Sequence, residues 1–476
     1  MIGLFGVLMS SFSNSLLSES YSDYQMDDLK ATKDWGRVKV ATQTRWKSNA
    51  FSSDGNTGFH SNHRVFSGGQ FFSQRGGSEN DEGRKYSGLV GANAIAGFRY
   101  EQSNHAFSLI LGPRLQAVES RKFEKEITSV WDSEAISSYE TQLSRFKLAV
   151  EGGRGWQRLD SYGFLFNGMA NYGQFQIVDT SGFSLALHSL SFKHREESLK
   201  PSAWNHDRKE VVGGAIRSSD LLFWENLQFF HYIYREPNHS NDPSQIPTAY
   251  EFGHFNYSGI ELRSIKFYEG FQFDLSIIRV TGLRKARTAP WTEVIQDTNA
   301  TLAYASLHAS FGLTHWNLSG LFSSKDQNAR LDKSSNGFAA PLAEPRVMGG
   351  YSSFFLYQSV YFPNDKIFFE FSERKVPGFE NKGQRLFGIQ FGYDIRNNLR
   401  GDIFLNRNSS ELGNGIEGIL KITHRFDSWP KGFILGSICY AYLNSDRKTI
   451  LISEPFTQLE GNKEFLRIYL SAGLEF

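Results

Sequence analysis

Leu466–Phe476, the end of the chain, reads LRIYLSAGLEF. Every second residue of this stretch is apolar. Successive side chains of a β-strand point to opposite faces, so this period gives a strand one apolar and one polar face, whereas a helix would scatter the same residues around its axis. The stretch therefore predicts a terminal β-strand. Its apolar face is Leu466, Ile468, Leu470, Ala472, Leu474 and Phe476, and its other face is Arg467, Tyr469, Ser471, Gly473 and Glu475.

The same alternation recurs upstream. Phe271–Ile277 places Phe273 and Leu275 opposite Asp274 and Ser276. A series of such strands indicates an all-β chain whose strands share one apolar side. The stretches with this period are Arg37–Trp46 (RVKVATQTRW), Val90–Tyr100, Phe271–Ile277, Ala303–Leu313 and Leu386–Asp394.

Length and composition fit one large barrel. The chain has 476 residues and no Pro/Gly-rich linker or change in composition that would divide it. Its mean hydropathy is −0.40, and it has no apolar run near the roughly 20 residues that a membrane helix needs. Barrel strands alternate lipid-facing with lumen-facing residues, so their average stays hydrophilic, and the 42 Phe and 20 Tyr residues suit aromatic girdles. We predict an all-β, transmembrane, antiparallel up-and-down β-barrel of about 18 strands (16–18), with about ten residues per strand.

Two kinds of connection separate the predicted strands. Asp394–Asn398 and Asp427–Gly432 carry turn residues. Long polar stretches predict loops at Ser52–His63, Ala117–Gln142, Glu196–Lys209, Pro237–Ala249 and Lys325–Pro345. Short turns at one end and long loops at the other are typical of outer-membrane barrels. Ala117–Gln142 is expected to contain a helix, either folded inward as a constriction or standing outside.

The N-terminus resembles a secretory signal. Ile2–Met9 is apolar and a serine-rich stretch follows, although no Lys or Arg precedes Lys30. A packed first strand is the alternative. We assign residues 1–19 to a signal peptide, 20–36 to a short periplasmic tail and 37–476 to a single barrel.

Charge and motifs exclude several classes of function. A net charge of +1 gives no basis for nucleic-acid binding, and a single cysteine, Cys439, excludes an internal disulfide and a cysteine-based metal cluster. Cys439 lies in an apolar predicted strand, so we expect it to be a small buried hydrophobic residue. The twelve His residues are scattered, and neither a nucleophile elbow nor a phosphate loop is present. We expect no enzyme activity, no cofactor and no metal.

The alternation assigns charged residues to the inner face. One interpretation is a lattice of mutually paired charges that stiffens the barrel. The other is a basic path for an anionic solute, since rings of Arg and Lys confer anion selectivity and a low-dielectric wall focuses their field. The predicted pore-lining residues are Arg37, Lys39, Arg45, Arg99, Lys147, Arg263, Asp274, Glu417, Lys421, Arg425 and Arg467.

The terminal strand ending on Phe476 resembles the C-terminal signature of bacterial outer-membrane barrels. That resemblance implies a location in the bacterial outer membrane, contact with its lipid, and the barrel-assembly machinery as a partner.

Three stretches are similar to the alginate-export family of outer-membrane channels. They are Phe271–Gly282 (FQFDLSIIRVTG), Leu318–Pro345 and Glu411–Phe426 (ELGNGIEGILKITHRF). Lys325 interrupts the second motif, and Gly415 stands where the third has an acidic residue. The resemblance implies an eighteen-stranded monomeric channel with an Arg/Lys-lined lumen that passes anionic polysaccharide or other solutes. Only Asp274, Glu417, Lys421 and Arg425 carry over as lumen residues.

Two functions remain open at this point. The first is a porin-like channel for hydrophilic, preferentially anionic solutes. The alternative is a surface adhesin that uses the barrel as a mount for long loops, with aromatic residues such as Trp131 and Trp204 as binding groups.

Overall fold

The computed structural model describes most of the chain from residue 57 onward. The described ranges are 57–76, 85–102, 104–121, 125–192, 209–221, 224–235, 251–264, 270–289, 292–324, 334–338, 340–341, 347–356, 383–410, 413–426, 431–451 and 457–475. The predicted signal peptide, periplasmic tail, strand Arg37–Trp46 and terminal Phe476 lie outside them, as do Trp204 and most of the loops predicted at Glu196–Lys209 and Pro237–Ala249. Among the described residues, no helix is long and apolar enough to span a membrane.

The described residues form one sheet, with a short 3-10 helix at Gly350–Ser352. Its strands are β1 (Thr57–Gly76), β2 (Lys85–Gln102), β3 (His105–Arg121), β4 (Lys125–Leu143), β5 (Phe146–Arg158), β6 (Asn167–Asp179), β7 (Phe183–Phe192), β8 (Lys209–Leu221), β9 (Trp224–Arg235), β10 (Glu251–Ser264), β11 (Gln272–Ala289), β12 (Thr292–Phe311), β13 (Thr314–Ser323), β14 (Ser334–Ser335), β15 (Gln384–Arg396), β16 (Leu399–Ser410), β17 (Gly413–Phe426), β18 (Lys431–Leu451) and β19 (Thr457–Glu475).

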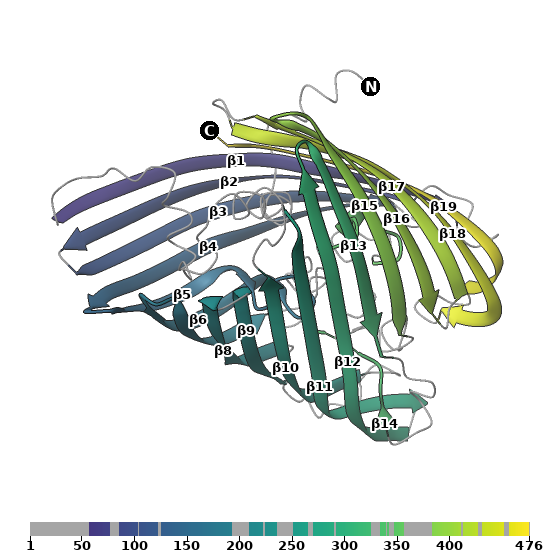
Figure 1. Ribbon diagram of the computed structural model, residues 1–476, viewed down its shortest axis with the longest axis horizontal. Helices are drawn as coiled ribbons and strands as arrows, with labels where there is room; N and C mark the ends of the chain where they lie inside the picture. The colour runs from purple at the N-terminus through teal and green to yellow at the C-terminus, as the bar shows by residue number, and fades with distance from the viewer. Residues whose placement is uncertain are drawn as a thin grey trace.

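Strand pairing follows chain order. Each long strand is antiparallel to the one before it and the one after it, and β13 pairs directly with β15. The two-residue strand β14 pairs in parallel with β12. The first strand, β1, pairs with both β2 and β19, so the two ends of the sheet are neighbours. Apart from β14, the sheet contains 18 strands curved around a central space (Figure 1). The predicted all-β, up-and-down architecture is confirmed.

The predicted alternation of faces is also confirmed. On β19, Leu466 is 42% exposed whereas the neighbouring Arg467 is 1% exposed. On β11, Asp274 and Ser276 are buried and Ile277 is exposed. The curvature of the sheet explains the difference, because outward side chains meet only the surroundings of the barrel, whereas inward side chains crowd against one another and against segments that enter the barrel.

The two ends of the sheet carry different connections. Tight turns at Ser144–Arg145, Gly312–Leu313 and Asn397–Asn398 join strands at one end, here called the turn end. The opposite end, here called the loop end, carries the long connection from β13 to β15. The predicted turn at Asp394–Asn398 is confirmed. Outer-membrane barrels keep their short turns in the periplasm, and by that rule the loop end would face outward.

The predicted loop at Ala117–Gln142 is wrong. This stretch forms the loop-end part of β3 and most of β4, including Trp131, so it is neither a helix nor a constriction. Glu134, Ser138 and Glu140 point inward whereas Ala135, Ser137 and Tyr139 are exposed. Polar residues occupy both faces there, so the period of two carries little hydrophobic contrast. The predicted loop Ser52–His63 is wrong from Thr57 onward, where β1 begins. Part of the predicted loop Lys325–Pro345 is buried, at Phe338, Ala340 and Pro341.

Candidate functional site: the inner face of the sheet

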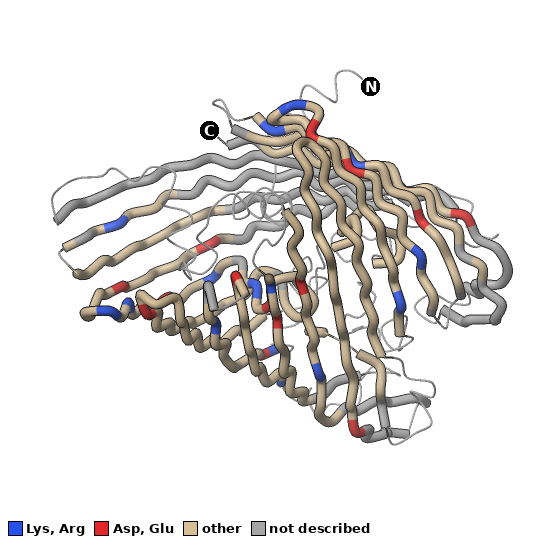
Figure 2. Tube along the Cα trace, in the orientation of Figure 1, with Lys and Arg blue, Asp and Glu red and all other residues tan. Residues whose placement is uncertain are grey.

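Strand register places the predicted inner residues on one wall. Residues directly opposite each other in antiparallel strands share a face of the sheet. One row of paired residues runs Arg263, Asp274, Ser306, Ser319, Gly388, Asn406 and Glu417. Figure 2 shows basic and acidic residues interspersed along the strands rather than grouped by sign.

The segment between β5 and β6, Leu159–Phe166, is held in a compact turn by its own acid. Asp160 accepts hydrogen bonds from the amides of Phe164, Leu165 and Phe166 at 2.6, 2.8 and 3.2 Å. The Leu159 amide donates to the Phe166 carbonyl at 3.1 Å and so joins the two ends of the turn. Burial raises the pKa of Asp160, and the three amide donors oppose that rise. We call this stretch the first inward segment.

The first inward segment reaches distant strands. The amide and hydroxyl of Ser161 donate to the Glu261 carboxylate on β10, at 3.1 and 2.6 Å. The ring centroids of Tyr162 and Phe164 lie 5.0 and 5.4 Å from that of Tyr304 on β12. Along the sheet, β10 lies four strands beyond β6, or about 19 Å at roughly 4.8 Å per strand. Because Glu261 and Tyr304 are buried on the inner face, the segment crosses the inside of the curve.

A second inward segment, Val347–Leu356, lies between β14 and β15 and is anchored on Glu417. The Ser353 hydroxyl donates to the Glu417 carboxylate at 2.5 Å, and the Phe354 and Phe355 amides donate at 2.7 and 3.3 Å. Asn406 donates to the same carboxylate at 2.7 Å and to the Met348 carbonyl at 2.9 Å. The carboxylate that the sequence assigned to the pore lining therefore binds this segment to the wall.

Arg467 makes the matching contact from β19. Its guanidinium donates to the Ser353 carbonyl at 2.6 Å and lies 5.4 Å from the Phe354 ring centroid. The Phe354 ring stacks on Phe465 with centroids 4.0 Å apart. Cys439, buried as predicted, lies beside the same anchor, with its sulfur 3.7 Å from Glu417.

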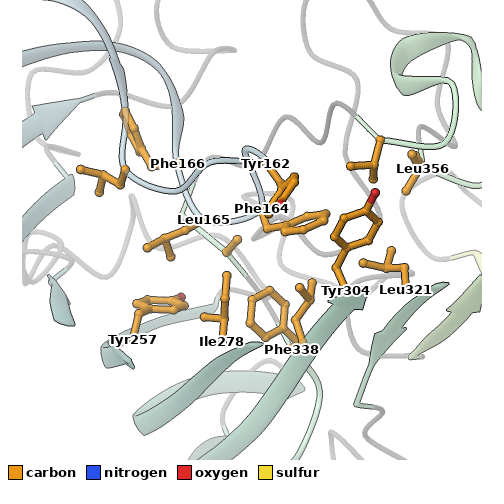
Figure 3. Close-up of a cluster of buried hydrophobic side chains, with 14 of the residues drawn as sticks. Tyr162, Phe164, Leu165, Phe166, Tyr257, Ile278, Tyr304, Leu321, Phe338 and Leu356 are labelled. Atoms are coloured by element: carbon orange, nitrogen blue, oxygen red, sulfur yellow. The ribbon is translucent and has the colours of Figure 1, made fainter. Parts of the chain in front are cut away.

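The two inward segments meet the barrel wall in an apolar cluster. Tyr162 and Phe164 of the first segment lie beside Tyr304, and Leu321, Phe338 and Leu356 complete the contact (Figure 3). The sequence assigned polar residues and a set of charged residues to the inner face. The aromatic and aliphatic residues of this cluster instead pack against segments that enter the barrel, whereas the inner face of β5 to β7 carries buried polar residues such as Glu151, Gln176 and His188.

Charged residues concentrate nearer the turn end, in three groups. In the first group, Glu140 on β4 accepts from Arg99 on β2 at 3.2 Å and from Lys147 on β5 at 2.6 Å. Two cations therefore share one carboxylate. The Lys147 side chain remains 30% exposed, whereas Glu140 is 3% exposed.

The second group is centred on Asp274. Arg263 donates to both carboxylate oxygens, at 2.9 and 3.3 Å, a bidentate geometry that only guanidinium provides. His308 Nε2 lies 3.0 Å from Asp274 Oδ2 and 2.9 Å from the Ser306 hydroxyl. The His308 side chain is 30% exposed.

The third group spans β13 to β17. His315 Nε2 lies 2.6 Å from Asp394, and Arg400 binds Asp402 at 2.9 Å. Lys421 is directly opposite Asp402 in the strand register, and half-buried Arg425 follows on the same face of β17.

The predicted pore-lining residues thus divide by environment. Arg99, Lys147, Arg263 and Asp274 belong to ion-paired groups, Lys421 and Arg425 lie on the inner face, and Glu417 and Arg467 anchor the second inward segment. Arg37, Lys39 and Arg45 lie outside the described residues. The predicted pore-lining set did not include Asp160, Glu140, His308 or Asp402, which hold the inward segment or the charged groups together. His308 already sat on the predicted inner face of its strand, whereas Glu140 was hidden in a stretch interpreted as a loop.

The outward face carries an apolar band. On β15 the exposed outward residues include Phe387, Ile389, Tyr393 and Ile395. From Phe387 to Ile395 a strand rises about 26 Å at roughly 3.3 Å per residue, and a tilt of about 40° leaves a height of about 20 Å. Outer-membrane barrels have a band of about 25 Å. Exposed aromatic residues gather near its turn end: Tyr100, Tyr139, Phe146, Phe183, Phe311, Trp316 and Tyr393.

Solved structures share this architecture. OccK2 (OpdF) of Pseudomonas aeruginosa matches with a TM-score of 0.53 and 11% identity, over 88% of this chain and 100% of that chain. OpdQ of the same organism matches with a TM-score of 0.52 and 10% identity, over 87% of this chain and 98% of that chain. OccK2 in complex with glucuronate gives a TM-score of 0.51 and 10% identity, over 87% and 98%. These proteins are outer-membrane porins.

At 10–11% identity the likeness establishes the fold. The chain therefore has the fold of bacterial outer-membrane porins. This fold agrees with the outer-membrane location predicted from the sequence. No protein-family model matches the chain, and no curated protein matches it. The narrower resemblance to alginate-export channels gains no support from these comparisons.

Proposed function

We propose that this protein is a porin-like channel that carries small hydrophilic solutes across the outer membrane. The observation that carries the proposal is the partial exposure of charged side chains on the inner face, at the level of the outward apolar band. Lys147, His308 and Arg400 each keep 26–30% of their side-chain surface exposed inside the barrel. Exposed charge is stable only in contact with water, so an aqueous path along this wall is expected.

The proposed path favours anions. Glu140 binds two cations, and Asp402 lies between Arg400 and Lys421. These pairs also place partly exposed basic side chains, Lys147 and Arg400, on the inner face. Basic rings in a low-dielectric wall raise the local concentration of anions. A sugar acid is a suitable candidate solute, since a structural neighbour binds glucuronate and its hydroxyl groups match a polar, charged wall.

Passage of an anionic polysaccharide is the narrower form of this proposal. It rests on the resemblance to alginate-export channels, whose lumen residues would correspond to Asp274, Glu417, Lys421 and Arg425. Glu417 is occupied by the second inward segment, and Asp274 is buried and bound by Arg263 and His308. Of the four residues, Lys421 and Arg425 therefore remain to line a path. Monomeric sugar acids are therefore the better-supported solutes.

Solute entry into liposomes tests the proposal. Protein reconstituted in liposomes should admit glucuronate faster than glucose when each is added outside and light scattering follows the swelling. Lys147→Gln combined with Lys421→Gln should reduce the ratio of the two rates, because both residues contribute exposed positive charge to the inner face. Arg396→Gln, at the exposed turn beside Asn397, is the matched control and should leave the ratio unchanged. Equal rates for both solutes in wild-type protein would contradict the anion preference, and no swelling with either would contradict the channel.

A further inference from the structure

Two arginines stand on the outward, lipid-facing wall. Arg385 is at the loop end of β15, and Arg407 is at the loop end of the neighbouring strand β16. Arg385 pairs with Ser409, and Arg407 pairs with Phe387. The two arginines are therefore diagonal neighbours on one face, where long side chains come within reach of each other. Both side chains are exposed.

The wall below them is apolar. Phe387 and Phe322 are 49% and 42% exposed, and Leu405 is 59% exposed on the strand that carries Arg407. The Arg385 guanidinium lies 6.0 Å from the Phe322 ring centroid. The pair therefore marks the upper limit of the apolar band on this wall, at the level of lipid headgroups.

Nothing described on this wall neutralises the pair. The outward residues of β13, β15, β16 and β17 within the band carry no acidic side chain among those that the structure describes. Two adjacent guanidinium groups repel each other, and charge on the lipid face of a barrel is destabilising in proportion to its depth. Both effects are relieved by an anion that bridges the two groups, and guanidinium pairs bind phosphate in this way.

We propose that Arg385 and Arg407 form a binding site for the phosphate group of a lipid in the outer leaflet, with its acyl chains along Phe322, Phe387 and Leu405. The site requires that this face meets the membrane, as the fold implies, and it does not depend on solute transport. An amphipathic ligand is favoured over free phosphate because the cations border the exposed apolar surface of Phe322, Phe387 and Leu405.

Native mass spectrometry of the detergent-purified full chain tests the proposal. The probes are phosphatidic acid and the diacylglycerol with the same acyl chains, which differ only in the phosphate, and inorganic phosphate alone. We expect the wild type to retain phosphatidic acid at least several-fold more than diacylglycerol. Arg385→Gln combined with Arg407→Gln should abolish that preference, and Arg396→Gln, at the turn end of the same strand, should retain it.

The outcomes separate the alternatives. Equal retention of both lipids by the wild type, or an undiminished preference in the double variant, would overturn the site. Inorganic phosphate binding that displaces no lipid would show an anion site without lipid recognition and would also overturn it. Heat-modifiable migration of every variant on gels confirms that each barrel is folded, and liposome swelling by the double variant shows separately whether the channel function stands.

Discussion

Residues that the sequence pattern places on the same inner face have different partners in the structure. Glu417 and Asp274 occupy the same row of paired residues, and both were predicted to line a pore. Glu417 is surrounded by hydrogen-bond donors from a segment that enters the barrel, whereas Asp274 is paired with Arg263 and the partly exposed His308. Alternation gives the direction of a side chain, but it does not give the partner that meets it.

Removing the charge of Glu417 should loosen the second inward segment. Glu417→Gln keeps the shape of the side chain but weakens bonds from the Ser353 hydroxyl and the Phe354 amide. Hydrogen bonds to charged groups contribute about 1.5–3 kcal/mol, so we expect the free energy of unfolding in urea to fall by about that amount. Asp297→Asn, an exposed residue on β12, is the control and should change it by less than about 0.5 kcal/mol. Equal, small effects of both substitutions would show that Glu417 is not an anchor.

The Arg263–Asp274 pair should show strong coupling. Asp274→Asn removes the carboxylate that binds a guanidinium only 9% exposed, and breaking a buried pair in this way costs about 3–5 kcal/mol. The double variant Arg263→Gln, Asp274→Asn should be less destabilised than the sum of the two single variants. Chemical unfolding of the four proteins measures the coupling, and strictly additive losses would contradict the pairing.

At the scale of elements, much of the strand pattern is predictable from the sequence because one face of each strand is apolar. β11, β12, β15 and β19 were predicted from their contrast between faces, and the structure confirms those faces. β3 and β4 were missed in part because Ala117–Gln142 is polar on both sides. The inward segments were not predictable, since Leu159–Phe166 is short and its anchors, Glu261 and Tyr304, lie far along the chain.

The close approach of strands β4 and β5 requires a glycine at position 153. Gly153 has φ +145°, and a Cβ there would lie 1.9 Å from the Ala135 carbonyl oxygen of β4. Gly153→Ala should therefore destabilise the β4–β5 pairing by more than the roughly 1–3 kcal/mol of backbone strain alone. Gly173→Ala on β6 is the matched control, because a Cβ there meets nothing within 4 Å. The yield of heat-modifiable barrel and its unfolding temperature measure the difference, and similar values for both variants would refute the close contact.

The contact between Ser161 and Glu261 should control the mobility of the first inward segment. Glu261→Gln weakens all of the Ser161 bonds while preserving the side-chain volume. In single-channel recordings we expect more frequent transitions between current levels, because the segment is then held mainly by its aromatic contacts. Asp179→Asn at the β6–β7 turn removes an acid that does not contact the segment, so its current trace should match the wild type. Traces that are identical for all three proteins would show that the segment does not border the path.

For the whole molecule, the class of fold could be predicted from the sequence. The segments that occupy the inside of the barrel could not. Length, the alternation of faces and the contrast between turn end and loop end together indicated one large outer-membrane barrel. An open interior lined by charged residues of both signs was the expectation from those features. The described residues instead show two inward segments that are anchored on Glu261 and Glu417 and that pack against an apolar cluster of the wall. Partly exposed charges lie nearer the turn end. That arrangement depends on contacts between strands that are far apart in the sequence, which no local pattern contains.

The most direct test of the central claim is the single-channel conductance of refolded protein in a planar bilayer, with the reversal potential measured across a salt gradient. We predict a steady conductance with a reversal potential of the sign that indicates anion preference, reduced or inverted by Lys421→Glu combined with Arg425→Glu. A well-folded, heat-modifiable barrel that conducts no ions would contradict the proposed aqueous path along the charged inner face.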